Sequence, residues 1–182
     1  DSLSLSKKLF KSIVNCNIKG NNRVGGIVGC ENEYKYSYSS FRENYVSGFI
    51  QANNYIGGIL GVGGGSDDSF RSEIYDNYFV GSLIGNQYVG GICGYAGSLA
   101  STKRNYSNAS ISGSSDVGGI IGYVGGKYSL TSNVAINETI SGKSNVGRIY
   151  GGKTSSYTPA STIGTANANK ALTTTKLIVK DI

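Results

Sequence analysis

The 182-residue sequence contains no histidine, no tryptophan and no methionine. Without histidine, Ser-His-Asp and Cys-His nucleophile systems are excluded in their usual form, and so are zinc sites with imidazole ligands. Cysteine is scarce, because three residues without a C-x-x-C pair leave at least one thiol unpaired. No apolar run reaches the roughly 18 residues typical of a membrane helix. These absences predict a protein that is not an enzyme, holds no cofactor and has no membrane span.

Charge is also sparse. Charged residues make up 15% of the chain, and 17 Lys and Arg against 11 Asp and Glu give a formal net charge of +6. A nucleic-acid-binding surface is expected to show a clustered basic stripe. The basic residues here are scattered along the sequence, without a run of five like charges. The pattern predicts a solvated surface and no nucleic-acid partner.

Proline is nearly absent, with Pro159 alone, whereas glycine is abundant at 28 residues. Each glycine inside a helix costs about 0.5–1 kcal/mol, so this composition disfavours a helical solenoid. Collagen is excluded because the glycines do not follow a Gly-x-y period. The composition therefore favours strands and turns.

One phrase, Val-Gly-Gly-Ile-x-Gly, occurs five times. Its copies, with small changes, begin at Val24, Ile56, Val89, Val117 and Val146. The steps between these positions are 32, 33, 28 and 29 residues. A period in this range indicates one supersecondary unit that is repeated and stacked on its neighbours.

Each copy has a matched upstream segment. An aliphatic residue lies six positions before the phrase, followed by a small turn residue and a polar linker. Farther upstream is Asn-Tyr, at Asn44-Tyr45, Asn77-Tyr78 and Asn105-Tyr106. We align Asn133-Val134 as a copy displaced by one residue, and Asn15-Cys16 as a contracted copy. Short runs of Val, Ile and Tyr bounded by Gly, Asn and Ser are typical of strands and turns.

The sequence thus predicts an all-β fold, a short right-handed parallel β-helix (β-solenoid) of about five coils with capping ends. Residues 13–157 form the repeats, residues 1–12 an N-terminal cap, and residues 158–182 a C-terminal cap or linker. The recurring aliphatics become interior ladders. The glycines lie where the chain turns with positive φ or where a Cβ has no room.

The repeated unit resembles the GLUG repeat of bacterial secreted and cell-surface proteins, most clearly over residues 77–94 and 105–122. The resemblance covers about residues 13–151, and the fifth copy departs from it at Arg148 and Tyr150. GLUG arrays occur in IgA-cleaving metallopeptidases, whose zinc site lies in a separate region, and in candidate adhesins. The resemblance implies an extracellular or cell-surface location and a non-enzymatic structural or adhesive module. Such a module presents a binding surface to a glycan or protein ligand, or spaces other domains.

Two motifs suggest chemistry of other kinds. Residues 147–154 match the phosphate-binding pattern G-x-x-x-x-G-K-T, but the following Ser-Ser-Tyr-Thr-Pro is poor helix material. The repeat already explains its glycines. Asp67 and Asp68 are adjacent carboxylates that Glu33 or Asp76 of neighbouring coils can meet. Because of these carboxylates, a β-helix carbohydrate-active enzyme is an alternative function for the chain.

Tyrosine supplies the candidate binding surface. Tyr34, Tyr36 and Tyr38 alternate with Lys35 and Ser37, which on a strand places the three rings on one face. Exposed, these rings form a platform for sugar or protein. The alternative is that they cover the first coil or pack on a neighbouring chain. The Asn-Tyr tyrosines are expected to stack as a ladder.

Two further expectations concern the ends and the sequons. The apolar residues at the N-terminus are expected to cover the first coil or to join one subunit to the next: Leu3, Leu5, Leu9, Phe10 and Ile13. In the second case the chain is a subunit of a filament or large extracellular assembly, and its partners are copies of itself. Asn105, Asn108 and Asn137 match the N-glycosylation sequon.

Overall fold

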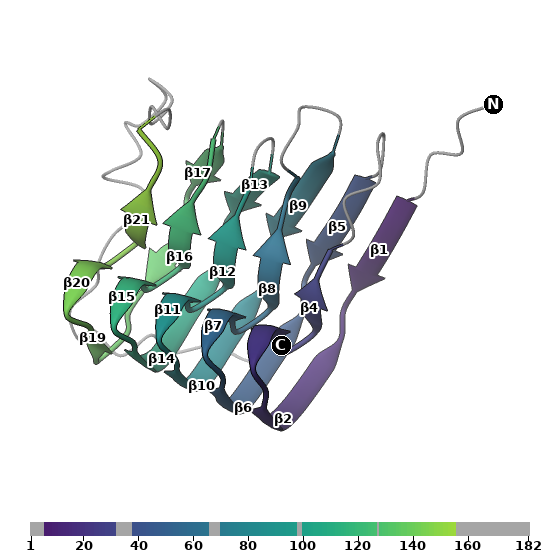
Figure 1. Ribbon diagram of the computed structural model, residues 1–182. Coiled ribbons are helices and arrows are strands. Elements are labelled where there is room, and N and C mark those ends of the chain that lie inside the picture. The colour runs from purple at the N-terminus through teal and green to yellow at the C-terminus, as the bar shows by residue number, and fades with distance from the viewer. Residues whose placement is uncertain (1–5, 32–37, 66–69, 98–99, 127, 156–182) are drawn as a thin grey trace.

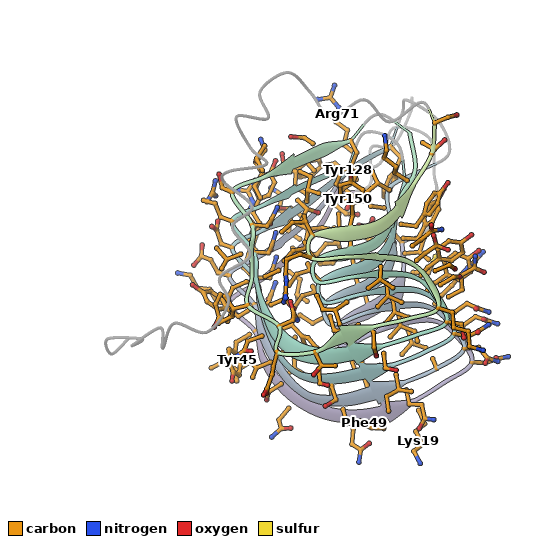
Figure 2. The ribbon with its side chains drawn as sticks, turned by 90° about the vertical axis from the view of Figure 1, so that its left-hand side faces the viewer. Lys19, Tyr45, Phe49, Arg71, Tyr128 and Tyr150 are labelled. Carbon is orange, nitrogen blue, oxygen red and sulfur yellow. The ribbon has the colours of Figure 1, made fainter. Side chains whose placement is uncertain are left out.

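The computed structural model describes residues 6–31, 38–65, 70–97, 100–126 and 128–155. Within these ranges the chain is an all-β parallel β-solenoid of about four turns, built from four parallel sheets and without a helix. Figure 1 shows the strands stacked side by side in successive coils. The coil is right-handed: viewed with the last coil nearest (Figure 2), β6 runs from Tyr45 at the left toward Phe49, and successive coils approach the viewer. The predicted fold is confirmed.

The strands form four parallel sheets, named A to D in the order in which the chain visits them. Sheet A contains β1 (Ser6–Phe10), β5 (Tyr38–Arg42), β9 (Arg71–Tyr75), β13 (Ala100–Lys103) and β17 (Ser129–Thr131). Sheet B contains β2 (Ile13–Lys19), β6 (Tyr45–Gln51), β10 (Tyr78–Ile84) and β14 (Tyr106–Ser112), with β18 (Val134–Ala135) and β19 (Ile140–Ser141) both paired to β14.

The repeated phrase builds sheets C and D. Sheet C contains β3 (Asn22–Gly25), β7 (Asn54–Gly57), β11 (Gln87–Gly90), β15 (Ser115–Gly118) and β20 (Ser144–Gly147). Sheet D contains β4 (Val28–Cys30), β8 (Leu60–Gly63), β12 (Cys93–Ala96), β16 (Ile121–Val124) and β21 (Tyr150–Lys153). Gly152 and Lys153 of the phosphate-loop pattern belong to strand β21, where a phosphate loop would begin its helix, so this segment is part of sheet D.

Like residues stack above like along the solenoid axis. The aliphatic residue upstream of the phrase forms one such column: Ile18, Ile50, Leu83, Ile111 and Ile140. In the middle coils these side chains are fully buried, as are Ile59, Ile92 and Ile120 of the phrase. The core is therefore a set of aliphatic ladders, as the repeat predicts.

The chain turns at two columns of non-glycine residues whose φ lies between 50° and 60°. They follow sheet A at Lys11, Glu43, Asp76, Arg104 and Ser132, and they lie within sheet C at Arg23, Tyr55, Tyr88, Asp116 and Asn145. Such a conformation is uncommon for these residue types. None of the phrase glycines has positive φ. These glycines were predicted either to turn with positive φ or to lie where a Cβ has no room, and the structure assigns them the second role.

A buried asparagine ladder follows the first of these corners. Asn44, Asn77, Asn105 and Asn133 are each at most 1% exposed. Asn44, Asn77 and Asn105 each donate from the backbone N–H and from Nδ2 to the Oδ1 of the next asparagine, as in the 2.8 Å bond from Asn44 Nδ2 to Asn77 Oδ1. Our alignment was wrong in the first coil, whereas in the last coil the one-residue displacement is taken up between β18 and β19, after the ladder position. Ser12, not Asn15, occupies this position in the first coil, and Asn133 is in register.

The first coil begins within the segment that we expected to cap it, because β1 pairs in parallel with β5. Leu9 packs against the core, whereas Phe10 and Ile13 are 47% and 84% exposed and do not cover the coil. Leu3, Leu5 and the expected C-terminal cap lie outside the described residues. The aliphatic columns are only partly buried in the first and last coils, as for Ile18 and Ile140.

Candidate functional site: the outer face of sheet A

The outward-facing residues of sheet A form columns that cross the coils. Between them lie inward residues such as Phe41, Ile74 and Leu130, which are buried. One outward column contains Lys8, Ser40, Glu73, Ser101 and Ser129. A second contains Phe10, Arg42, Tyr75, Lys103 and Thr131. Tyr38 and Arg71 are paired at the start of the sheet, where Figure 2 shows Arg71 extending from the ribbon. We call this surface the sheet A face.

Tyr75 lies at the centre of the face with three cations around its ring. The distances to the ring centroid are 4.9 Å for Arg42 Cζ, 5.4 Å for Lys103 Nζ and 5.7 Å for Arg104 Cζ. Cations within about 6 Å of an aromatic centroid are attracted to the ring. The tyrosine therefore holds together positive charges that would otherwise repel one another.

Two carboxylates complete the network. Glu73 Oε2 accepts a 2.5 Å hydrogen bond from the Tyr38 hydroxyl and another from Arg42 Nη2. Burial acts to raise the pKa of Glu73, but these hydrogen bonds and the charge of Arg42 outweigh it, and the pKa is lowered. Asp76 accepts two 2.7 Å bonds from Arg104 in a bidentate pair. In the part of the chain that the structure describes, Lys8, Arg71 and Lys103 have no carboxylate partner.

The predicted candidate surface is only partly described. Tyr38 lies on the sheet A face, whereas Tyr34 and Tyr36 lie outside the described residues, as do Glu33, Asp67 and Asp68. Asp76 is held by Arg104. No three-carboxylate arrangement can therefore be traced from the predicted acidic residues.

The gathering of basic residues was missed at the sequence level. Lys8, Arg42, Arg71 and Lys103 are far apart in the chain, yet they lie in adjacent strands of one sheet. The signal was present, because Arg42, Tyr75 and Lys103 are separated by the same 33 and 28 residues as the repeated phrases. Aligning the outward positions of the repeat would have revealed it.

Sequence analysis also missed a tyrosine cluster at the corner between sheets C and D. Tyr88 contacts Tyr55, Tyr95 and Tyr123 at centroid distances of 4.9, 5.9 and 5.3 Å. Tyr95 and Tyr123 stack at 5.7 Å with an interplanar angle of 5°. Burial is the main reason that the pKa of Tyr88 is raised. The half-buried rings cover this corner.

The Asn-Tyr tyrosines share one outward column of sheet B, as expected of a ladder. The rings of Tyr78 and Tyr106 lie 5.5 Å apart. Tyr45 and Tyr78 remain 41% and 45% exposed. In Figure 2 Tyr45 and Phe49 point away from the coil. This column therefore adds aromatic surface without a net charge.

The carboxyl group of Glu31 is buried at the N-terminal end of the solenoid. Glu31 is 3% exposed and accepts a 2.9 Å hydrogen bond from the Gly64 N–H at Oε2. The Ser39 and Ser72 hydroxyls lie near the group, but Oε1 has no hydrogen bond of good geometry. Burial raises the pKa of Glu31, and this effect exceeds the lowering by Gly64, by the two serines and by the charge of Lys7.

We expect Glu31 to make the solenoid less stable as pH rises. A carboxyl group whose pKa in the folded state exceeds its ordinary value of 4.5 contributes stability that is complete below that value. The contribution is lost as pH rises through the raised pKa. Glu31→Gln should remove this decline and be about 1–3 kcal/mol more stable than the parent at pH 8. Urea unfolding of both proteins between pH 4.5 and 8 measures the difference, and parallel profiles would contradict it. The lowered pKa of Glu73 acts in the opposite sense but cancels in this comparison.

The three sequon asparagines have different surroundings. Asn105 belongs to the buried ladder, and its Nδ2 donates to Ile74 O at 2.7 Å. Asn137 is 2% exposed, and its Nδ2 donates to Ser107 Oγ and Ala109 O at 3.0 and 2.8 Å. Asn108 is exposed on sheet B. Only Asn108 presents its side chain to solvent.

In a host that glycosylates sequons, we expect a glycan on Asn108 of the folded protein and none on Asn105 or Asn137. The two buried amide nitrogens are already bonded inside the coil, where a sugar has no room. Mass spectrometry of tryptic glycopeptides gives the occupancy. Asn108→Gln should leave the folded protein without N-glycan, and a glycan retained on that variant would refute the expectation.

The three cysteines lie within the described residues. Cys16, Cys30 and Cys93 form no disulfide with one another, and Cys93 is buried in an aliphatic column with Leu60 and Ile121. Among the described residues, no group of three or more Cys, Asp or Glu is placed to hold a metal ion. None of the described segments is a helix of the length and apolarity needed to cross a membrane.

No protein-family model, curated protein or solved structure matches the chain. The family resemblance therefore rests on the repeated phrase and on the coils that it forms. The sheet A face is identified from its own geometry.

Proposed function

We propose that the chain is a non-enzymatic, extracellular structural or adhesive module of the GLUG-repeat type. It presents a binding surface at a cell surface, or it spaces other domains. The observation that carries the proposal is the sheet A face, where register aligns charged, hydroxyl and aromatic side chains into columns on a fully buried core. A stack of coils at a spacing of ~4.8 Å is a rigid support for an extended ligand.

The network on this face favours binding over catalysis. Its carboxylates, Glu73 and Asp76, are each held by an arginine. A glycosidase needs one carboxyl group with a raised pKa beside an ionised partner, whereas the pKa of Glu73 is lowered. The carbohydrate-active enzyme therefore ranks below the adhesive module.

A glycan array and a cell-binding assay with the whole chain test the proposal. We expect retention on at least one glycan class, and a large reduction in the variant Tyr38→Ala/Tyr75→Ala. Tyr95→Ala, in the tyrosine cluster at the corner between sheets C and D, is the control away from the sheet A face. Hydrolysis of a bound polysaccharide would replace the adhesive function with an enzymatic one.

End-to-end assembly is a second candidate, favoured by the two end coils. Columns that are fully buried in the middle coils are only partly buried there, and Val146 in the last coil is 44% exposed. Parallel edge strands pair readily with further strands. Sedimentation analysis of the chain over a range of concentrations tests this, because a monomer at high concentration excludes the filament.

A further inference from the structure

We propose that the sheet A face binds an acidic polysaccharide whose chain lies along the solenoid axis, with Lys8, Arg71 and Lys103 as its main anchors. The inference names the ligand class of the surface described above, and it rests on the proposed adhesive function. Neutral glycans, nucleic acids and proteins are the competing ligands.

Positive charge is concentrated on the sheet A face. Four outward residues of sheet A are cationic, and the adjoining corner adds two more: Lys8, Arg42, Arg71, Lys103, Lys11 and Arg104. Among the described residues three carboxylates share the surface, which leaves these residues with a net charge of +3: Glu43, Glu73 and Asp76. By contrast, Lys19 is the sole charged residue within the described strands of sheet B. A polyanion approaching the module is thus attracted to one face.

The cations of the sheet A face are also distributed along the solenoid axis. Lys8, Arg42, Arg71 and Lys103 come from four successive strands, β1, β5, β9 and β13. Neighbouring strands lie ~4.8 Å apart, so each coil offers one positive charge per step along the axis. The charges do not converge on a point, as they would for a single small anion. Arg42 and Lys103 share one column, whereas Lys8 lies two positions and Arg71 four positions earlier along their strands. The cations therefore form a band along the axis, which suits a chain that carries acidic groups along its length.

Carboxylate and hydroxyl groups lie between the cations of the sheet A face. Glu73, Ser101 and Ser129 form the neighbouring column. An open hollow on this side of the molecule is lined by Arg71, Glu73, Ser101 and Ser129, together with Tyr128. Carboxylate and hydroxyl oxygens accept hydrogen bonds from sugar hydroxyl groups, which a polysaccharide has and a DNA backbone lacks.

The ring of Tyr75 further favours a polysaccharide over nucleic acid. Single-stranded nucleic acids bind by stacking their bases on open aromatic faces. Here Arg42, Lys103 and Arg104 occupy positions around the ring, and its hydroxyl is bonded to Ser101. The ring organises cations rather than offering a stacking platform.

The test is a binding titration of the whole chain with polygalacturonate, dextran and a DNA duplex at two salt concentrations. We expect polygalacturonate to bind more tightly than the other two, and its affinity to fall as salt is raised. Arg71→Glu/Lys103→Glu should weaken this binding about tenfold or more, because it replaces two attractions by repulsions. Lys19→Glu/Lys143→Glu has the same net charge, lies away from the face, and should bind within about twofold of the parent.

Three outcomes would overturn the proposal. Equal weakening in both double variants would show a response to net charge alone. Tighter binding to the DNA duplex would assign the face to nucleic acid. Absence of polygalacturonate binding, with adhesion retained in the glycan array or the cell-binding assay, would reject the acidic ligand and leave the adhesive function standing. Both variants should fold, because the substituted side chains point outward. Circular dichroism of each variant checks this.

Discussion

Gly91→Ala should destabilise the solenoid by about 3 kcal/mol or more, a large part of the 5–15 kcal/mol that usually holds a domain folded. A Cβ at this position would lie 2.1 Å from the carbonyl oxygen of Gly119 and 2.1 Å from Ser107 Oγ. The first atom is backbone of the next coil, which has coils on both sides and cannot move away. The same column is equally tight at Gly58, where a Cβ would lie 2.3 Å from Gly91 O.

The chain contains a matched control for this substitution. Arg148 occupies the same position of the phrase in the last described coil, where its guanidinium donates to Asn137 O. Arg148→Ala loses that bond without creating a clash, and should cost about 1 kcal/mol. Urea unfolding followed by far-ultraviolet circular dichroism compares the two variants. Similar midpoints would show that the glycine column is not required for close packing.

The sequence predicts the repeated interior of the fold but not its corners. The period and the aliphatic positions follow from a simple rule, since each coil must place the same residues inside. The residues that turn with positive φ do not follow from this rule. At the corner before the asparagine ladder they are Lys, Glu, Asp, Arg and Ser in successive coils. Four of these five side chains are exposed, so burial does not select the residue type and leaves no compositional signal. Only stacking of successive coils fixes the left-handed conformation there.

The candidate site was harder to predict for a related reason. The sheet A strands follow the connections of variable length between copies, so the outward residues Arg42, Tyr75 and Lys103 have no common neighbouring motif. The tyrosine alternation drew attention to residues 34–38, of which Tyr38 alone is described. Charge that looks dispersed along the chain becomes local once the register is known.

Asn77→Ala is expected to have the second large effect on stability. The Asn77 Oδ1 accepts from Asn44 N and Nδ2, at 3.2 and 2.8 Å. Its Nδ2 donates to Phe41 O and Asn105 Oδ1, each at 2.9 Å. Alanine removes all four bonds and leaves buried donors and a carbonyl oxygen without these partners. Because each unsatisfied buried group costs about 1–3 kcal/mol, we expect a loss of about 3 kcal/mol or more.

The loss of stability should depend on the burial of the asparagine side chain and not on the residue type. Asn53 also donates to an asparagine of the preceding coil, with 2.9 Å from its Nδ2 to Asn21 Oδ1, but this pair is exposed to water. Solvent replaces the lost partners there, so Asn53→Ala should cost less than about 1 kcal/mol. Asn77→Asp separates the two roles of the amide, because it retains acceptor oxygens and loses the donor. If Asn77→Ala and Asn53→Ala have the same unfolding midpoint, the interior ladder does not stabilise the coils, and the aliphatic columns alone must hold them together.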